Sequence, residues 1–177
     1  MSRRLFLALS GSAMLSVVSS CRTRIPFTNP ALPLFSRNER AMLEAVQDHL
    51  LPSEPGSPGA RDVGTLAYLE AALLGSDIPS EDLPTLRHGL KSLEVLSNTL
   101  GVPSVVAASA QQREVILRTF EAGVQGQIWL TLVMGYTLEA YVGDPVYGGN
   151  PGGIVWQWLG HTAGFPRPPR SVVDERR

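Results

Sequence analysis

The sequence predicts an all-α domain, a small irregular bundle of four to five helices with a Gly/Pro/aromatic-rich C-terminal loop segment. Apolar residues recur at helical spacing in several stretches that proline and glycine separate, and two of these stretches begin with the spacing of a capping box. No run of β-branched residues alternates with polar ones at a period of two, so the sequence offers little material for a sheet. Helices joined by short connections are typical of a bundle.

The first two helices are expected near the start of the domain. Ser36 and Glu39 have capping-box spacing, and Pro52 ends the apolar pattern that follows them. A second helix is expected over about 60–74, with Gly75 as its stop. Its inner face would consist of Val63, Leu66, Leu69 and Leu73.

The third and fourth helices are likewise predicted from N-cap residues and apolar spacing. Ser80 is the expected N-cap of the third helix, whose leucine stripe runs from Leu83 to Leu100 before Gly101 ends it. A fourth helix is expected after a second capping box, and it carries three apolar residues. The box consists of Ser109 and Gln112, and the apolar residues are Val115, Ile116 and Phe120.

A break at Gly123 and Gly126 precedes an apolar run from Ile128 to about Val142, which is expected to form the central helix of the core. A second membrane anchor is the competing interpretation. Burying an ionised carboxylate in lipid is costly, and the run carries one, so the core helix is favoured. Polar residues and a glycine interrupt this apolar segment of the chain, namely Gln125, Gln127, Gly135 and Glu139.

The last quarter of the chain combines flexibility with aromatic side chains. Residues 142–153 hold too much glycine and proline for regular structure, and residues 154–159 could form one short turn of helix. Two interpretations stand side by side: a protein contact surface, or aromatic side chains that cap the core. The aromatic residues concerned are Tyr136, Tyr141, Tyr147, Trp156, Trp158 and Phe165.

The N-terminus has the pattern of an export signal. Arg3, Arg4 and Phe6 stand before a short apolar run that is too short to span a bilayer, which resembles the twin-arginine consensus and predicts a signal peptide over residues 1–20. An ordinary secretion signal that carries two arginines is the alternative.

The single cysteine suggests a lipid anchor. Cys21 follows Val-Ser-Ser, which resembles a lipobox, and it leaves no partner for an internal disulfide. Acylation there would anchor the protein on the periplasmic side of a bacterial membrane, whereas cleavage nearby would leave Cys21 unmodified. Residues 21–35 are then a Pro-rich tether, 36–166 the helical domain and 167–177 a flexible tail.

Composition and motifs argue against catalysis and nucleic-acid binding by this chain. The formal charge of −1 with one lysine offers no basic surface for a polyanion. Dinucleotide and Walker glycine motifs are absent, and one cysteine cannot attach haem c. His49, His88 and His161 lie on separate predicted elements, which disfavours a zinc site. We therefore expect no catalytic, cofactor-binding or metal residues, with His161 kept as a weak interface candidate.

Two segments of the chain, taken together, have the pattern of a known protein family. The first is Leu50-Leu51-Pro52 with Ser57-Pro58-Gly59-Ala60-Arg61-Asp62-Val63-Gly64. The second is Glu139-Ala140-Tyr141 through Gly143-Asp144-Pro145-Val146-Tyr147-Gly148-Gly149-Asn150, then Trp156-Gln157-Trp158-Leu159-Gly160. Together these segments resemble the gluconate 2-dehydrogenase subunit 3 family. The chain departs from the family ending at His161, with extra residues before Phe165-Pro166.

The resemblance implies a role in a complex. Members are the small subunit of membrane-associated FAD-dependent sugar or polyol dehydrogenases, beside a large flavoprotein and often a multihaem cytochrome c subunit. The small subunit would assist folding, assembly and twin-arginine export of the flavoprotein, while FAD and haem stay in the partners. A stand-alone helical structural lipoprotein is the alternative. The resemblance suggests partner contacts through Tyr141, Asp144, Pro145, Tyr147, Gly148, Gly149, Asn150, Trp156 and Trp158.

Overall fold

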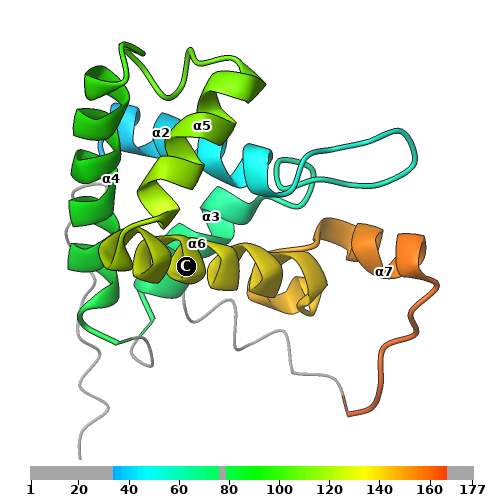
Figure 1. The fold of residues 1–177 in the computed structure, drawn as a ribbon. Coiled ribbons are helices and arrows are strands. Elements are labelled where there is room, and N and C mark those ends of the chain that lie inside the picture. The colour runs from blue at the N-terminus through cyan, green and yellow to red at the C-terminus, as the bar shows by residue number, and fades with distance from the viewer. Residues whose placement is uncertain (1–33, 76–78, 167–177) are drawn as a thin grey trace, which may run out of the picture. The chain divides into compact units, whose positions relative to one another are not determined.

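The computed structural model describes residues 34–75 and 79–166, so the predicted signal peptide, nearly all of the tether and the C-terminal tail lie outside the described residues. The described elements are helices throughout, which confirms the all-α prediction (Figure 1). Within these ranges one isolated bridge, between Glu54 and Ser57, is the only strand-like pairing. The elements in chain order are α2 (Arg37–Leu50), α3 (Thr65–Leu73), α4 (Asp82–Thr99), α5 (Ala110–Glu121), α6 (Val124–Val142), the 3-10 turns η1 (Pro145–Tyr147) and η2 (Pro151–Gly153), and α7 (Ile154–Leu159).

Both predicted capping boxes are present. The Glu39 amide donates to Ser36 Oγ at 3.2 Å and the Ser36 amide donates to Glu39 Oε2 at 2.7 Å. At α5 the corresponding distances between Ser109 and Gln112 are 3.2 and 2.9 Å. Each box satisfies backbone donors that the first helical turn leaves unpaired, so both helices begin where the sequence predicts.

Two other helix starts differ from the prediction. The second helix begins at Thr65 rather than near 60, because Gly64 has φ 69°, a left-handed conformation that cannot continue a helix. Residues 60–64 form turns instead. The N-cap of α4 is Glu81 and not Ser80, whose hydroxyl contacts the Glu81 carboxylate at 3.3 Å. Pro84 lies in the first turn of α4, where a missing amide proton costs little.

The predicted break at Gly126 is also wrong. Gly126 is a buried residue inside α6, and the break between α5 and α6 consists of Ala122 and Gly123. A Cβ at position 126 would lie 1.8 Å from the Phe120 carbonyl oxygen, so glycine lets the start of α6 pack directly on the end of α5. The sequence pattern suggests that Gly126 breaks the helix, whereas in the fold Gly126 lets α5 and α6 approach each other closely.

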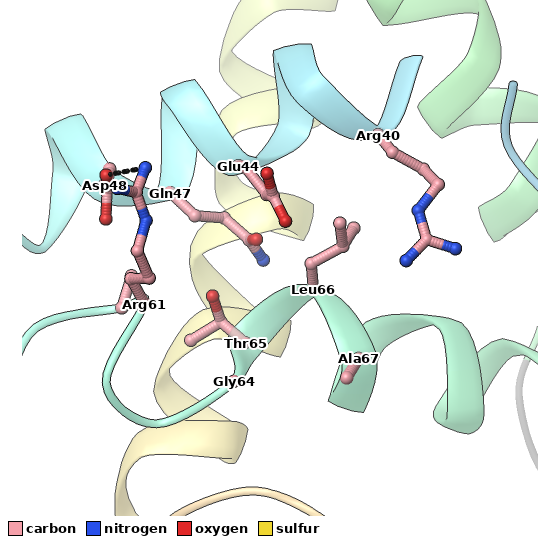
Figure 2. A pocket seen from close by; sticks show the side chains of 10 residues that line it. Arg40, Glu44, Gln47, Asp48, Arg61, Gly64, Thr65, Leu66 and Ala67 are labelled. Atoms are coloured by element: carbon pink, nitrogen blue, oxygen red, sulfur yellow. Dashed lines mark ion pairs between the residues drawn. The ribbon is translucent and has the colours of Figure 1, made fainter. Parts of the chain in front are cut away.

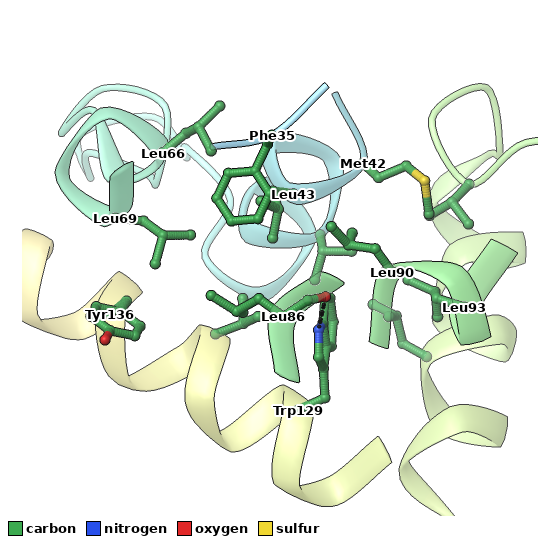
Figure 3. Packing of buried hydrophobic residues seen from close by; sticks show 14 of the residues in the cluster. Phe35, Met42, Leu43, Leu66, Leu69, Leu86, Leu90, Leu93, Trp129 and Tyr136 are labelled. Carbon is green, nitrogen blue, oxygen red and sulfur yellow. Dashed lines mark hydrogen bonds between the residues drawn. The ribbon is translucent and has the colours of Figure 1, made fainter. Parts of the chain in front are cut away.

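The long apolar helix is central, as predicted. α6 contacts α2, α3, α4, α5 and α7, and Figure 1 shows it running beneath α2 and α5. Trp129 of α6 is fully buried and donates from Nε1 to the Leu86 carbonyl oxygen of α4 at 2.9 Å (Figure 3). Phe35, the last residue of the predicted tether, is buried in the same core. In the part of the chain that the structure describes, no helix combines the length and hydropathy needed to cross a bilayer.

Candidate partner-binding surface

The two sequence segments that resemble the subunit 3 family lie against each other in the structure. The Tyr141 hydroxyl at the end of α6 donates to the Pro58 carbonyl oxygen at 2.8 Å. Val63, Tyr141 and Val155 form a second small apolar cluster, with Leu51 packed against it. We call this meeting point of residues 51–64 and 139–160 the motif junction. Its formation brings residues more than eighty positions apart into contact.

The first half of the motif junction is a tightly folded loop. The Asp62 carboxylate accepts a hydrogen bond from the Ser53 hydroxyl at 2.5 Å and one from the Gly59 amide at 2.8 Å. These two donors hold the pKa of Asp62 below its ordinary value, because they stabilise the ionised form. A Cβ on Gly59 would lie 2.2 Å from the Ser53 backbone nitrogen. The Pro-Gly pair of this motif therefore serves loop geometry.

The second half follows α6 and holds two 3-10 turns. Asp144 caps η1 by accepting from the Val146 amide at 3.0 Å, and Gly148 after it has φ 97°. Gly149 packs on α6, since a Cβ there would lie 2.5 Å from the Ala140 carbonyl oxygen. Residues 142–153 are therefore not wholly irregular, contrary to the prediction from the sequence, because they include the end of α6 and two short 3-10 turns.

Asn150 fastens this segment to the elements on both sides of it. It is fully buried and has φ 46°, a left-handed conformation that asparagine tolerates better than most residues. Its Oδ1 accepts from the Val155 amide at 2.8 Å, and its Nδ2 donates to the Gly143 carbonyl oxygen at 3.2 Å. One side chain thus links the end of α6 to the start of α7, which has the predicted bounds.

The aromatic residues divide between packing and exposure. Tyr136 and Tyr141 are buried, and Trp156 donates from Nε1 to the Val142 carbonyl oxygen at 2.8 Å. Trp158 packs its ring edge against Tyr141 with 6.4 Å between centroids, yet it is exposed, as are Tyr147 and Phe165. The core-capping interpretation therefore describes the first group. The exposed group remains available to a partner, and partner contact stays a prediction.

The nine predicted contact residues likewise include buried, half-buried and exposed members. Tyr141, Gly149 and Asn150 are buried, and their structural roles explain their positions in the motif. Asp144, Pro145 and Trp156 are half-buried, while Tyr147, Gly148 and Trp158 are exposed. All nine therefore belong to the segment 141–158, but only Tyr147, Gly148 and Trp158 are exposed to solvent.

The three histidines lie on different elements, as the sequence indicates. His49 lies in the last turn of α2, and its Nε2 lies 2.7 Å from Glu114 Oε2 of α5, a contact that sequence reasoning missed. The ring of His161 packs against Trp156 at 5.3 Å between centroids, and His88 is exposed on α4. Within the described ranges, no group of three His, Cys, Asp or Glu side chains is arranged to hold a metal ion.

Tyr136 also makes a contact that the sequence did not indicate. Its hydroxyl donates to Asp82 Oδ2 at 2.6 Å, which joins the middle of α6 to the first turn of α4. Burial and the neighbouring Asp82 carboxylate both raise the pKa of Tyr136 far above its ordinary value. Tyr136 therefore stays protonated and acts as a structural donor.

A small polar pocket lies between α2 and α3 (Figure 2). It encloses about 140 Å³, with the Arg61–Asp48 ion pair of 2.6 Å at one end and Arg40 at the other. Gln47 on its wall is 1% exposed and donates from Nε2 to Thr137 Oγ1 at 3.3 Å, while its Oε1 has no partner among the described residues. Sites for cofactors usually enclose roughly 300–1,000 Å³, so this pocket is small for such a ligand.

These features define a helical domain whose motif residues build a loop-and-turn surface. The family model described as Gluconate 2-dehydrogenase subunit 3 matches residues 37–164, which is most of the chain. The chain belongs to this family, and the resemblance noted in its sequence is confirmed. No curated protein and no solved structure matches the chain.

Proposed function

We propose that this protein is the non-catalytic small subunit of a membrane-associated, periplasm-facing FAD-dependent sugar or polyol dehydrogenase. In this role it assists the folding, assembly and twin-arginine export of the flavoprotein subunit. The observation that carries the proposal is the family match over residues 37–164, because that family is named as a subunit of a dehydrogenase. The Arg3-Arg4 pair ahead of a short apolar run supports the export component.

The division of labour has a physical reason. FAD binds a folded protein, so a flavoprotein loaded in the cytoplasm must cross the membrane already folded. A signal on this chain serves both subunits if they are bound before transport. Acylation of Cys21 would then hold the complex at the periplasmic side of the membrane. Electrons would pass from the substrate to FAD and on to haem c within the partner subunits.

The chemistry of the described side chains supports a binding role. The motif carboxylate Asp62 and the motif amide Asn150 are both hydrogen-bonded to this chain's own loops. Tyr147 and Trp158 of the second motif segment are exposed, and tyrosine and tryptophan often carry the energy of protein contacts. The motif residues are therefore better suited to shaping a contact surface than to reacting with a substrate.

Export of the flavoprotein tests the proposal. The full chain is co-expressed with its candidate flavoprotein subunit, and dehydrogenase activity is measured in the periplasmic and cytoplasmic fractions. Changing Arg3→Lys together with Arg4→Lys should move the activity from the periplasm to the cytoplasm. The matched control changes Arg22→Lys and Arg24→Lys, which lie after the predicted cleavage site and should leave export intact. Unchanged periplasmic activity in the first variant would favour the stand-alone lipoprotein alternative.

A further inference from the structure

The central helix exposes an apolar stripe along its length. Residues of α6 at alternating steps of four and three are all exposed, which places them on one face of the helix. The exposed fractions are 70% for Val124, 49% for Ile128, 45% for Leu138 and 53% for Val142. Thr131 and Gly135 complete the spacing between them. We call these six residues the α6 stripe.

The α6 stripe takes no part in the hydrophobic core of this chain. The opposite face of the same helix already packs inward through Trp129, Val133, Tyr136 and Ala140. Exposed apolar side chains at this regular spacing therefore indicate a face that another element covers in the assembled protein.

A groove follows the α6 stripe on the side of α5. It encloses about 650 Å³ between α6, α5 and the end of α2, and its apolar lining consists of Leu50, Leu117, Leu130, Met134 and Leu138. Gly135 lies in this lining at the middle of the stripe, and a Cβ there would meet nothing within 4 Å. The missing side chain leaves room for the backbone of a second helix to approach closely.

The two sides of the groove differ in charge. On the α5 side, Glu114 and Glu121 both contact Arg118, at 2.8 and 3.0 Å, and His49 lies 2.7 Å from Glu114. Two carboxylates share one guanidinium, so these three side chains together carry a net negative charge. The α6 stripe itself carries no charged residue. A complementary surface would therefore be apolar along α6 and basic along one flank.

We propose that this groove binds an amphipathic helix of the flavoprotein subunit, with its apolar face on the α6 stripe and lysine or arginine residues toward α5. This inference rests on the proposed function and assigns the surface through which the two subunits join. The binding mode is a helix in a groove, which depends on apolar anchors three and four residues apart. The stripe ends at Val142, whose carbonyl oxygen accepts a hydrogen bond from Trp156 of α7 in the motif junction.

The charge distribution favours a different protein over a second copy of this chain. An antiparallel pair of α6 helices related by a two-fold axis would place the α5 edge of one copy against the α5 edge of the other. Glu114 and Glu121 would then face the same residues of the second copy, and the repulsion would oppose pairing. A partner helix with basic residues on one flank meets no such cost.

Filling the groove provides the first test. Gly135→Leu places a side chain in open space and replaces glycine with a good helix former, so the fold should be retained. The full chain, tagged and co-expressed with the flavoprotein, should bind it at least tenfold more weakly in this variant. The matched control Ala71→Leu adds the same side chain to an exposed position of α3 and should bind normally. Thermal unfolding of each variant alone confirms that both are folded.

A photo-crosslinking amino acid at Leu138 identifies the occupant directly. A crosslink to a helical peptide of the flavoprotein supports the inference. A crosslink to a second copy, or to residues 1–33 or 167–177 of the same chain, overturns it. If the wild type and the Gly135→Leu variant bind the flavoprotein equally well, the inference fails while the proposed function stands. If the wild type does not bind the flavoprotein, both fail.

Discussion

Single glycines of this protein serve opposite purposes on neighbouring helices. Gly89 of α4 lies against the buried indole of Trp129, where a Cβ would lie 1.9 Å from the ring atom Cδ1. Gly135 of α6 faces open space. Both residues are inside helices, where glycine is less favourable than alanine by about 1 kcal/mol. Gly89 therefore lowers the helix propensity of α4 but leaves room for the Trp129 indole. Gly135 leaves room for no other residue of this chain.

Substituting alanine at these two positions should change stability in opposite directions. Gly89→Ala should lower the free energy of unfolding by about 1–3 kcal/mol or more, because the buried indole must move. Gly135→Ala should raise it by about 1 kcal/mol through helix propensity alone. Urea unfolding of both variants measures the difference. A stable Gly89→Ala variant would show that Trp129 does not pack as described.

At the scale of the element, local hydrogen bonds decided which boundaries could be predicted. The capping boxes at Ser36 and Ser109 need only residues three positions apart, so the starts of α2 and α5 were visible in the sequence. The start of α3 depends on the left-handed conformation of Gly64, and the inclusion of Gly126 in α6 depends on contact with Phe120. Those two features arise from backbone conformation and tertiary packing, which spacing does not reveal.

The serine caps give a prediction at this scale. Ser36→Ala and Ser109→Ala should each lower the free energy of unfolding by about 1 kcal/mol, since each removes the acceptor of a helix-terminal amide. Ser80→Ala is the matched control and should change it by less than about 0.5 kcal/mol, because Ser80 is not an N-cap. Chemical denaturation of the three variants tests the assignment. An equal loss in all three would contradict it.

At the scale of the whole molecule, the two motif segments were visible in the sequence but their contact was not. The hydrogen bond from Tyr141 to Pro58 joins residues that no local pattern relates. The same holds for His49 with Glu114, which belong to different helices. The candidate surface was predictable as a set of residues, whereas its division into buried and exposed members depends on how α6 and α7 pack against the loop at 51–64.

Acid should weaken the folded state through carboxylates that the fold keeps ionised. The pKa of Asp62 is lowered by hydrogen bonds from Ser53 and Gly59, and that of Glu114 by His49 and Arg118. A folded pKa below the unfolded one gives stability that is complete above the ordinary carboxyl range and is lost as the pH falls through the lowered value. Thermal unfolding should therefore shift to lower temperature below about pH 4.

Asp62→Asn separates this contribution from the others. The variant should be less stable than the wild type at neutral pH, because the amide is a weaker acceptor for the Ser53 hydroxyl and the Gly59 amide. The difference between the two proteins should shrink as the pH falls. A difference that stays constant from pH 7 to pH 3 would show that ionisation of Asp62 does not stabilise the loop.

The most direct measurement of the central claim is the visible absorption spectrum and dehydrogenase turnover of the affinity-purified chain, expressed alone and with the flavoprotein. A colourless, inactive protein is expected when the chain is alone. Flavin absorbance with sugar- or polyol-dependent turnover is expected when the flavoprotein is co-expressed and purifies with it. Bound cofactor or turnover in the chain alone would contradict a non-catalytic role, and a chain that purifies without the flavoprotein would contradict its role as a subunit.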